Sequence, residues 1–436
     1  MAAAAPRSYA IPRDRIAALL PPAFFACAVA FLAAALVLLP FVVGALGEHF
    51  YQAHVLAVTH IVALGWISMV MMGVLYRYVP GLTKRPLPHP GVALAQWVTF
   101  AVGVLGLVVH FWLGRWTGTA WSAGLVLVSA VLLCVNLWPM LRAAPGRGVA
   151  EVGILAASTF LVAAATLGVL LAVNKEYQLL GGGFFTNLGA HVHLAALGWV
   201  GVTISALSFR FLPAFLLPTL DLTGAARRQV MVLAGWVVLL VASLLAPSAL
   251  VALAALGAAG ALAAYLVLLV RLVRSHRMPI DWTARHALAS AAWLGVTMLC
   301  GLSLLATGVD APAGVRLGAA YGVAGLLGWM SNLVIGVSYK LFPGFVSAAR
   351  SERRRAAVPI ASLAAPPGAQ PPVFALFNAG VALTAGGLAT GLGALALGGS
   401  LVAAAGGLLY AALAVRTLAF AVTDPRRPPT SLPVVP

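Results

Sequence analysis

The chain has 436 residues, of which 62% are hydrophobic and only 8% are charged, and its formal net charge is +17. Soluble globular proteins carry about 25% charged residues, so this composition excludes that class and indicates a protein that folds in a lipid bilayer. The cysteines, Cys27, Cys134 and Cys300, stand apart without a CxxC spacing, which argues against a disulfide framework, a thiolate metal site and covalently attached haem.

Twelve apolar runs are long enough to cross a bilayer as helices. None alternates with the period of a membrane β-barrel, so an all-α polytopic membrane protein is predicted. The first run is longer than a signal-peptide core and is expected to be retained as a span. The runs lie at approximately 16–46, 50–80, 90–114, 120–142, 149–174, 186–218, 228–246, 248–273, 286–308, 316–345, 372–396 and 398–422.

The loops between these runs alternate between basic and nearly uncharged. The loop after the second run carries Lys84 and Arg85, and the loops after the other even-numbered runs and both chain ends are also basic. Because Lys and Arg concentrate in cytoplasmic loops, both termini are predicted to be cytoplasmic, in a bacterial-type inner membrane. The positive charge therefore reflects membrane topology, and no nucleic-acid partner is expected.

One sequence pattern, which we call the frame, occurs in the second, sixth and tenth runs. Each copy has a Gly-Trp pair, a basic residue eleven positions after the tryptophan and a proline three positions further on. The basic residues Arg77, Arg210 and Lys340 are expected to reach the lipid headgroups. The copies read HIVALGWISMVMMGVLYRYVPGL at 60–82, HLAALGWVGVTISALSFRFLPAF at 193–215 and VAGLLGWMSNLVIGVSYKLFPGF at 323–345.

The spacing of the frames predicts three pseudo-repeated units of four helices around a pseudo-threefold axis. The units are expected at about 16–142, 149–273 and 286–422. The Arg- and Pro-rich loop at 350–371 and the tail at 425–436 are predicted to be cytoplasmic and are assigned no chemistry.

Two frames carry a histidine six positions before the tryptophan, His60 and His193, where the third has Val323. Ionisable residues at membrane depth are costly and usually functional. Two neutral imidazoles at one depth on neighbouring helices can hold a haem iron between them, which predicts haem b. The alternative is a pair of packing histidines that hydrogen-bond across the bundle.

A further histidine, His191, lies two positions before His193 and points about 200° away from it. It is therefore a candidate ligand for a second haem or metal, with His54 as a possible partner. The remaining histidines near loops, His286 among them, are assigned to solvated surface. No carboxylate lies at mid-membrane, which argues against a proton pump.

The stretch HVHLAALGW at 191–199 resembles the helix that ligates both haems in haem–copper oxidase and nitric oxide reductase catalytic subunits, most closely the C-family oxidases. The resemblance implies twelve helices in three arcs, with His193 and His60 on a low-spin haem and His191 on a second, ligand-binding haem. It also implies electron transfer, or binding or reduction of NO or O₂, with electrons from a cytochrome c-type or other donor subunit.

The sequence also departs from that family. The HxH helix is the sixth span rather than the tenth, the seventh span has no histidine, and the tenth has Tyr321 and Val323 where HxH would align. The residues therefore argue against copper and against oxygen reduction with proton pumping. The layout is also similar to the NnrS family of haem and copper membrane proteins. An alternative from another class is a haem-free transporter or assembly protein that kept the fold.

Overall fold

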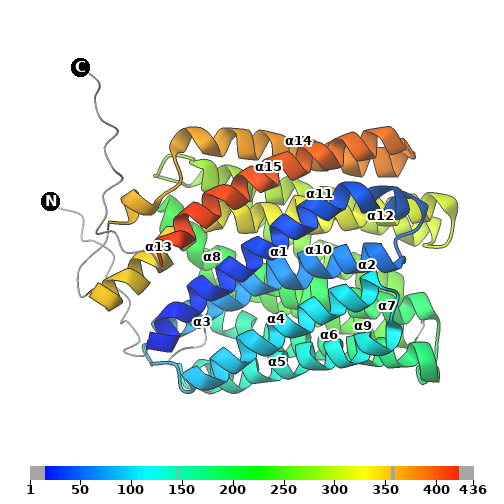
Figure 1. Ribbon diagram of the computed structural model, residues 1–436, viewed down its shortest axis with the longest axis horizontal. Coiled ribbons are helices and arrows are strands. Elements are labelled where there is room, and N and C mark those ends of the chain that lie inside the picture. Colours follow the sequence, from blue (N-terminus) through cyan, green and yellow to red (C-terminus); the bar gives the residue numbers. More distant parts are fainter. Residues whose placement is uncertain (1–14, 145, 147, 247, 355–358, 422–436) are drawn as a thin grey trace.

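The computed structural model describes residues 15–421 except 145, 147, 247 and 355–358 (Figure 1). In this part of the chain there are helices and no strand, and twelve helical rods are long and apolar enough to cross a membrane. The predicted all-α polytopic membrane fold is therefore confirmed.

Nine of the rods are single helices, and three are built from three consecutive segments. The single helices are α1 (Arg15–Glu48), α4 (Pro90–Trp112), α5 (Trp116–Arg142), α6 (Val149–Tyr177), α9 (Thr223–Leu245), α10 (Leu250–Arg274), α11 (Trp282–Thr307), α14 (Gln370–Thr390) and α15 (Gly393–Ala419). The composite rods, which we call frame helices 1, 2 and 3, are α2 (Ala53–His60), η1 (Ile61–Ser68) and α3 (Met69–Thr83); α7 (Phe184–His193), η2 (Leu194–Gly201) and α8 (Val202–Leu216); and α12 (Pro312–Val323), η3 (Ala324–Ser331) and α13 (Asn332–Arg354).

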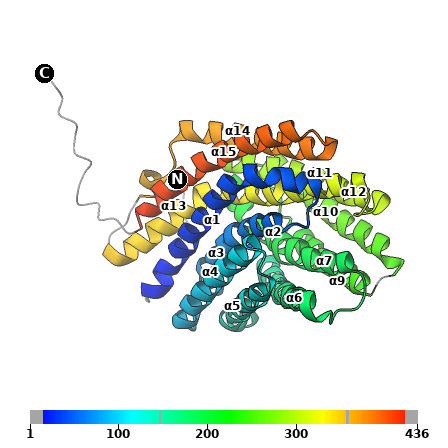
Figure 2. The same ribbon diagram turned by 45° about the vertical axis from the view of Figure 1, so that its right-hand side comes forward.

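The rods lie side by side along one axis, and the first and the last of them are neighbours because α1 packs against α15 (Figure 2). We call the end of the bundle at which α3, α8 and α13 finish the basic end, since Lys84 and Arg85 follow α3 there and Arg227 and Arg228 lie at the start of α9. The other end is called the opposite end.

The three frame helices meet through their tryptophans, which are the largest fully buried side chains: Trp66, Trp199 and Trp329 are at most 2% exposed. The indole Nε1 of Trp199 donates a hydrogen bond of 2.9 Å to the Ser68 hydroxyl, which joins frame helices 1 and 2. The ring of Trp329 lies 3.4 Å from where a Cβ on Gly201 would be, which brings frame helix 3 against frame helix 2. Frame helices 1 and 3 touch through η1 and η3.

Each frame helix contains a π-helical segment in the same place, from five residues before its tryptophan to two after it. Such segments are rare and are frequent at functional sites. In two of them a serine hydroxyl donates to the carbonyl five residues earlier, at 2.8 Å for Ser68 and 2.7 Å for Ser331. The residue six before the tryptophan therefore stands at the junction where the α-helix becomes a π-helix.

A repeated contact joins each frame helix to the rod that precedes it. The glycine before each tryptophan packs so closely on an aromatic ring that an added Cβ would lie within 2.6 Å of it. A second contact repeats as well. On the preceding rod, the residue seven positions before the aromatic residue packs against the frame-helix residue eight positions after the glycine. The pairs are Gly65–Phe31, Gly198–Phe160 and Gly328–Trp293 for the first contact, and Gly73–Phe24, Ala206–Gly153 and Gly336–His286 for the second.

These contacts align α1, α6 and α11 residue by residue, whereas the division of the whole chain into three units of four helices stays a prediction. Part of the predicted loop at 350–371 is helical: α13 continues to Arg354, and short 3₁₀ turns, η4 and η5, occupy Ile360–Leu363 and Pro367–Ala369. The predicted tail at 425–436 lies outside the described residues. All three cysteines are free.

Replacing Ser68 by alanine is expected to lower the stability of the bundle by about 1–2 kcal/mol, because it leaves the buried Trp199 Nε1 without an acceptor. Thermal unfolding of the purified protein in detergent measures the loss. The matched control is Ser303→Ala, since that exposed hydroxyl bonds only a carbonyl of its own helix. Equal midpoints for the two variants would contradict a role for the Trp199–Ser68 bond in joining the frame helices.

Candidate functional site

His60 and His193 have the same local geometry. The Nδ1 atom of His60 lies 2.8 Å from the carbonyl oxygen of Leu56, and that of His193 lies 2.7 Å from the carbonyl oxygen of Gly189. A carbonyl oxygen only accepts, so Nδ1 carries the proton and donates in both rings. The Nε2 atom of each neutral ring then keeps its lone pair, which is the form that binds a metal.

His191 reaches the same state through a neighbouring helix. Its Nδ1 donates to the carbonyl oxygen of Ala164 on α6, at 3.0 Å. Its Cε1 lies 3.0 Å from where a Cβ on Gly168 would be, so the ring packs flat against a helix surface that only glycine leaves open. His60, His191 and His193 therefore each present Nε2 as the free nitrogen.

The directions of these rings decide which of them can act together. The ring of His60 packs on Phe111 of α4, with the ring centroids 4.9 Å apart, while His191 faces α6. Because α4, α5 and α6 pack against one another in that order, both histidines face the same side of frame helices 1 and 2. We call this side the first frame interface.

The same register assigns two further interfaces. Positions six and eight before a tryptophan point about 200° apart, so each interface combines position six of one frame with position eight of the next. Tyr321 holds position eight in the third frame, and it packs on Gly301 as His191 packs on Gly168, with a Cβ on either glycine 3.0 Å from the ring. Applied in order, this register would pair His60 with His191 at the first interface, His193 with Tyr321 at the second, and Val323 with Val58, which carry no donor atom, at the third.

His54 lies apart from these pairs. It stands in the first turn of α2 at the opposite end of the bundle, and it is exposed. Its ring meets Trp112 edge-on, with the centroids 4.6 Å apart. A role for His54 as a ligand stays a prediction.

An aromatic cluster that the sequence did not single out covers the first interface at the opposite end. Phe111, which packs on His60, touches Trp116 with the ring centroids 5.8 Å apart. The Lys175 ammonium lies 3.6 Å above Trp116 and 4.8 Å from the ring centroid of Tyr51. Burial raises the pKa of Tyr51 to about 12, so its hydroxyl stays neutral. The cluster extends from His60 towards the opposite end of the bundle.

The assignment of His286 to solvated surface is wrong, because this side chain is fully buried. Asp281 accepts a hydrogen bond from the backbone N–H of Ala284 and caps α11 there, so the helix begins at Trp282. His286 then falls one turn inside the helix and packs on Gly336 of α13. Only the position of the helix start, which a cap such as Asp281 indicates, could have revealed this from the sequence.

In the described part of the chain, no three His, Cys, Asp or Glu side chains gather where they could hold a metal ion. Any metal chemistry drawn from these residues therefore rests on pairs of donors. No protein-family model matches the sequence, and no protein of curated function is significantly similar to it.

Proposed function

We propose that this protein holds b-type haem between side chains of its frame helices, in a bacterial-type inner membrane with both termini cytoplasmic. The supporting observation is the shared state of His60, His191 and His193, each of which has Nδ1 fixed by a backbone carbonyl and Nε2 free. Metal-ligating histidines almost always donate their other ring N–H in this way. Packing histidines that hydrogen-bond to each other across the bundle would use Nε2 instead.

The first frame interface suits a haem with two imidazole ligands. His60 and His191 come from different frame helices, and their rings pack on α4 and on α6, which lie on the same side of those helices. A haem iron with two protein ligands has no open position, so its chemistry is the transfer of one electron. The protein's part is to keep both rings in one tautomer and orientation, through Leu56 and Ala164, and to exclude water with Phe111 and Trp116.

The second frame interface suits a different task, because it pairs an imidazole with a phenol. His193 would hold the haem iron, and the hydroxyl of Tyr321 would offer a hydrogen bond on the opposite side. An iron with one imidazole ligand keeps a position for a diatomic gas such as NO or O₂, and a nearby donor favours its binding. This proposal includes no catalytic step and no copper. A cytochrome c-type or other donor subunit would supply the electrons.

The absorption spectrum of the purified, dithionite-reduced protein tests the proposal. Expression with adequate haem should give a Soret band and the α band of a b-type haem. Added CO should shift part of the Soret band, from haem at the second interface. A protein without these bands would instead be a haem-free transporter or assembly protein, and an unchanged spectrum after CO would remove the gas-binding part alone.

A further inference from the structure

One helix interface differs in chemistry from its two counterparts. The repeated contacts place Phe24, Gly153 and His286 at one position, and Phe31, Phe160 and Trp293 at another. The same spacing aligns the residues between these two positions and the residues of the frame helices that lie opposite them. At four aligned positions the first two rods and frames are apolar and the third is polar: Phe24, Gly153 and His286; Ala28, Ala157 and Ser290; Phe31, Phe160 and Trp293; and Met69, Val202 and Asn332.

The three equivalent interfaces show which of these side chains the fold itself requires. The fold accepts apolar side chains at these positions twice, so packing does not require the polar ones. Burying polar groups costs free energy even when they are paired, and His286 and Asn332 are both fully buried. The polar groups between α11 and frame helix 3 are therefore retained for something other than stability.

The hydrogen bonds fix the state of His286. Its Nδ1 lies 2.8 Å from Oδ1 of Asn332, whose Nδ2 donates to the carbonyl oxygen of Gly328 and to Oδ1 of Asn378. Oδ1 of Asn332 is thus an acceptor, and Nδ1 of His286 carries the proton. The indole Nε1 of Trp293 also donates a hydrogen bond of 3.0 Å to Oδ1 of Asn378. The lone pair remains on Nε2, which is buried and has no hydrogen-bond partner.

A second unpartnered group lies near the first. Tyr339 of α13 lies with its ring centroid 5.9 Å from that of His286, and its hydroxyl is also buried without a partner. Tyr339 lines a small cavity together with Ser338, Tyr410 and Thr417, and this cavity has room for about one water molecule. Phe374 of α14 closes the remaining side of the imidazole edge-on.

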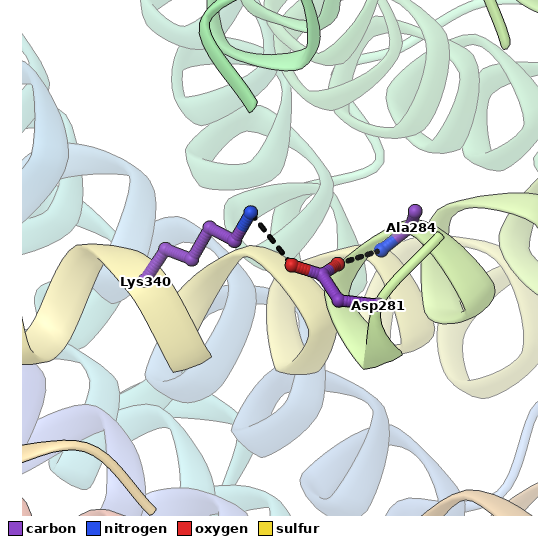
Figure 3. A network of polar contacts seen from close by, with 3 residues as sticks. All are labelled: Asp281, Ala284 and Lys340. Carbon is purple, nitrogen blue, oxygen red and sulfur yellow. Dashed lines mark hydrogen bonds and ion pairs between the residues drawn. The ribbon is translucent and has the colours of Figure 1, made fainter. Parts of the chain in front are cut away.

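Charged groups lie only one helical turn away, at the basic end. The Lys340 ammonium lies 2.7 Å from a carboxylate oxygen of Asp281, which also caps α11 (Figure 3). The guanidinium of Arg285 stacks over the ring of Trp282 at 4.3 Å. The titratable and charged residues of the elements around His286 include Asp281, Arg285 and Cys300 of its own helix and cap, Tyr339, Lys340 and Arg350 of α13, Tyr410 and Arg416 of α15, Arg316 and Tyr321 of α12, and Tyr265, Arg271 and Arg274 of α10.

We propose that His286 is a proton-binding site that is filled from the basic end. A proton from the solvent at the basic end reaches the water in the cavity and makes it a hydronium ion. This ion gives a proton to the Tyr339 oxygen as Tyr339 passes its own hydroxyl proton to Nε2, so the water and the tyrosine are both restored. The imidazole becomes an imidazolium that donates from Nδ1 to Asn332 and from Nε2 to the Tyr339 oxygen, and no electron moves. The site involves none of the proposed haem ligands, so it stands whether or not the protein binds haem.

Solid-state NMR of the full-length protein, labelled with ¹⁵N-histidine and held in lipid bilayers, tests this proposal. Subtracting the spectrum of His286→Phe, which installs the residue found in α1, isolates the signals of His286. We expect a protonated Nδ1 and a bare Nε2 at neutral pH, with Nε2 gaining a proton on acidification. In Tyr339→Phe the same conversion should need a roughly tenfold higher proton concentration, because the imidazolium loses a hydrogen bond.

Tyr76→Phe is the matched control, since Tyr76 holds the position of Tyr339 in the first frame and its hydroxyl is likewise buried without a partner. It should leave the His286 signals unchanged. A bare Nε2 at every pH at which the protein stays folded would overturn the proposal, as would an unaltered titration in Tyr339→Phe. If His286→Phe does not fold, the comparison of wild type with Tyr339→Phe decides the question.

Discussion

His191→Ala and His60→Ala are each expected to abolish the low-spin haem signal. The signal is measured in the absorption spectrum of the reduced protein and in the electron paramagnetic resonance spectrum of the oxidised protein. In the proposed arrangement, each of these residues supplies one of the two axial nitrogens at the first frame interface. Loss of either ligand leaves an iron with an open position. Substitution by alanine removes that nitrogen without adding bulk, so the protein should still purify as a monodisperse species.

His193→Ala separates the two possible pairings. If His60 pairs with His191, His193→Ala keeps the low-spin signal and loses the CO-reactive one. If His60 pairs instead with His193, as the sequence resemblance implies, His193→Ala loses the low-spin signal and His191→Ala keeps it. His54→Ala, at an exposed site, is the control and should leave both signals intact. Survival of the low-spin signal in His60→Ala would refute either pairing.

Gly198→Ala is expected to destabilise the protein by about 3 kcal/mol, at the upper end of the usual cost of overpacking. The added Cβ would lie 2.6 Å from Cγ of Phe160, and neither rod can move away easily because the frame helix is held at Trp199. The loss should appear as a lower thermal unfolding midpoint in detergent and as a smaller yield of monodisperse protein.

The double variant Gly198→Ala/Phe160→Leu should recover much of this loss, because the smaller side chain leaves room for the methyl group. The non-additive part of the two effects measures the contact directly. Gly235→Ala is the control, since nothing lies within 4 Å of a Cβ there; alanine should raise helix stability by up to about 1 kcal/mol. Equal losses for Gly198→Ala and Gly235→Ala would show that the Phe160 contact does not limit the substitution.

The spans were predictable because the cost of unsatisfied backbone groups in lipid leaves helices as the only solution for long apolar runs. The second frame helix, expected at 186–218, runs from Phe184 to Leu216. The π-helical segments were not predicted, since one extra residue in a turn leaves no periodic trace in a uniformly apolar run. The only sequence signal was the spacing around the tryptophans, which is repeated three times. This spacing marks where the segments lie but does not reveal that they are π-helical.

The candidate site was predictable in its residues and not in its pairings. The repeat picked out His60 and His193 as equivalent, and equivalent residues around a threefold axis point in directions rotated from one another. In the proposed pairing, the side chains that face each other come from non-equivalent positions, such as those of His60 and His191. Such a pairing follows from the arrangement of the helices and cannot be read from the repeat alone. Tyr321 was noticed only as a departure from HxH, whereas its contact with Gly301 shows it in the place that His191 occupies.

The valine pair at the third frame interface bears on how the protein is made. Val58 and Val323 come from the first and last frames, so this interface can form only once frame helix 3 has entered the membrane. The second interface also waits for frame helix 3, whereas the first interface, with His60 and His191, needs only frame helices 1 and 2. Ring closure, which also brings α1 against α15, therefore needs apolar packing alone and does not have to wait for a cofactor.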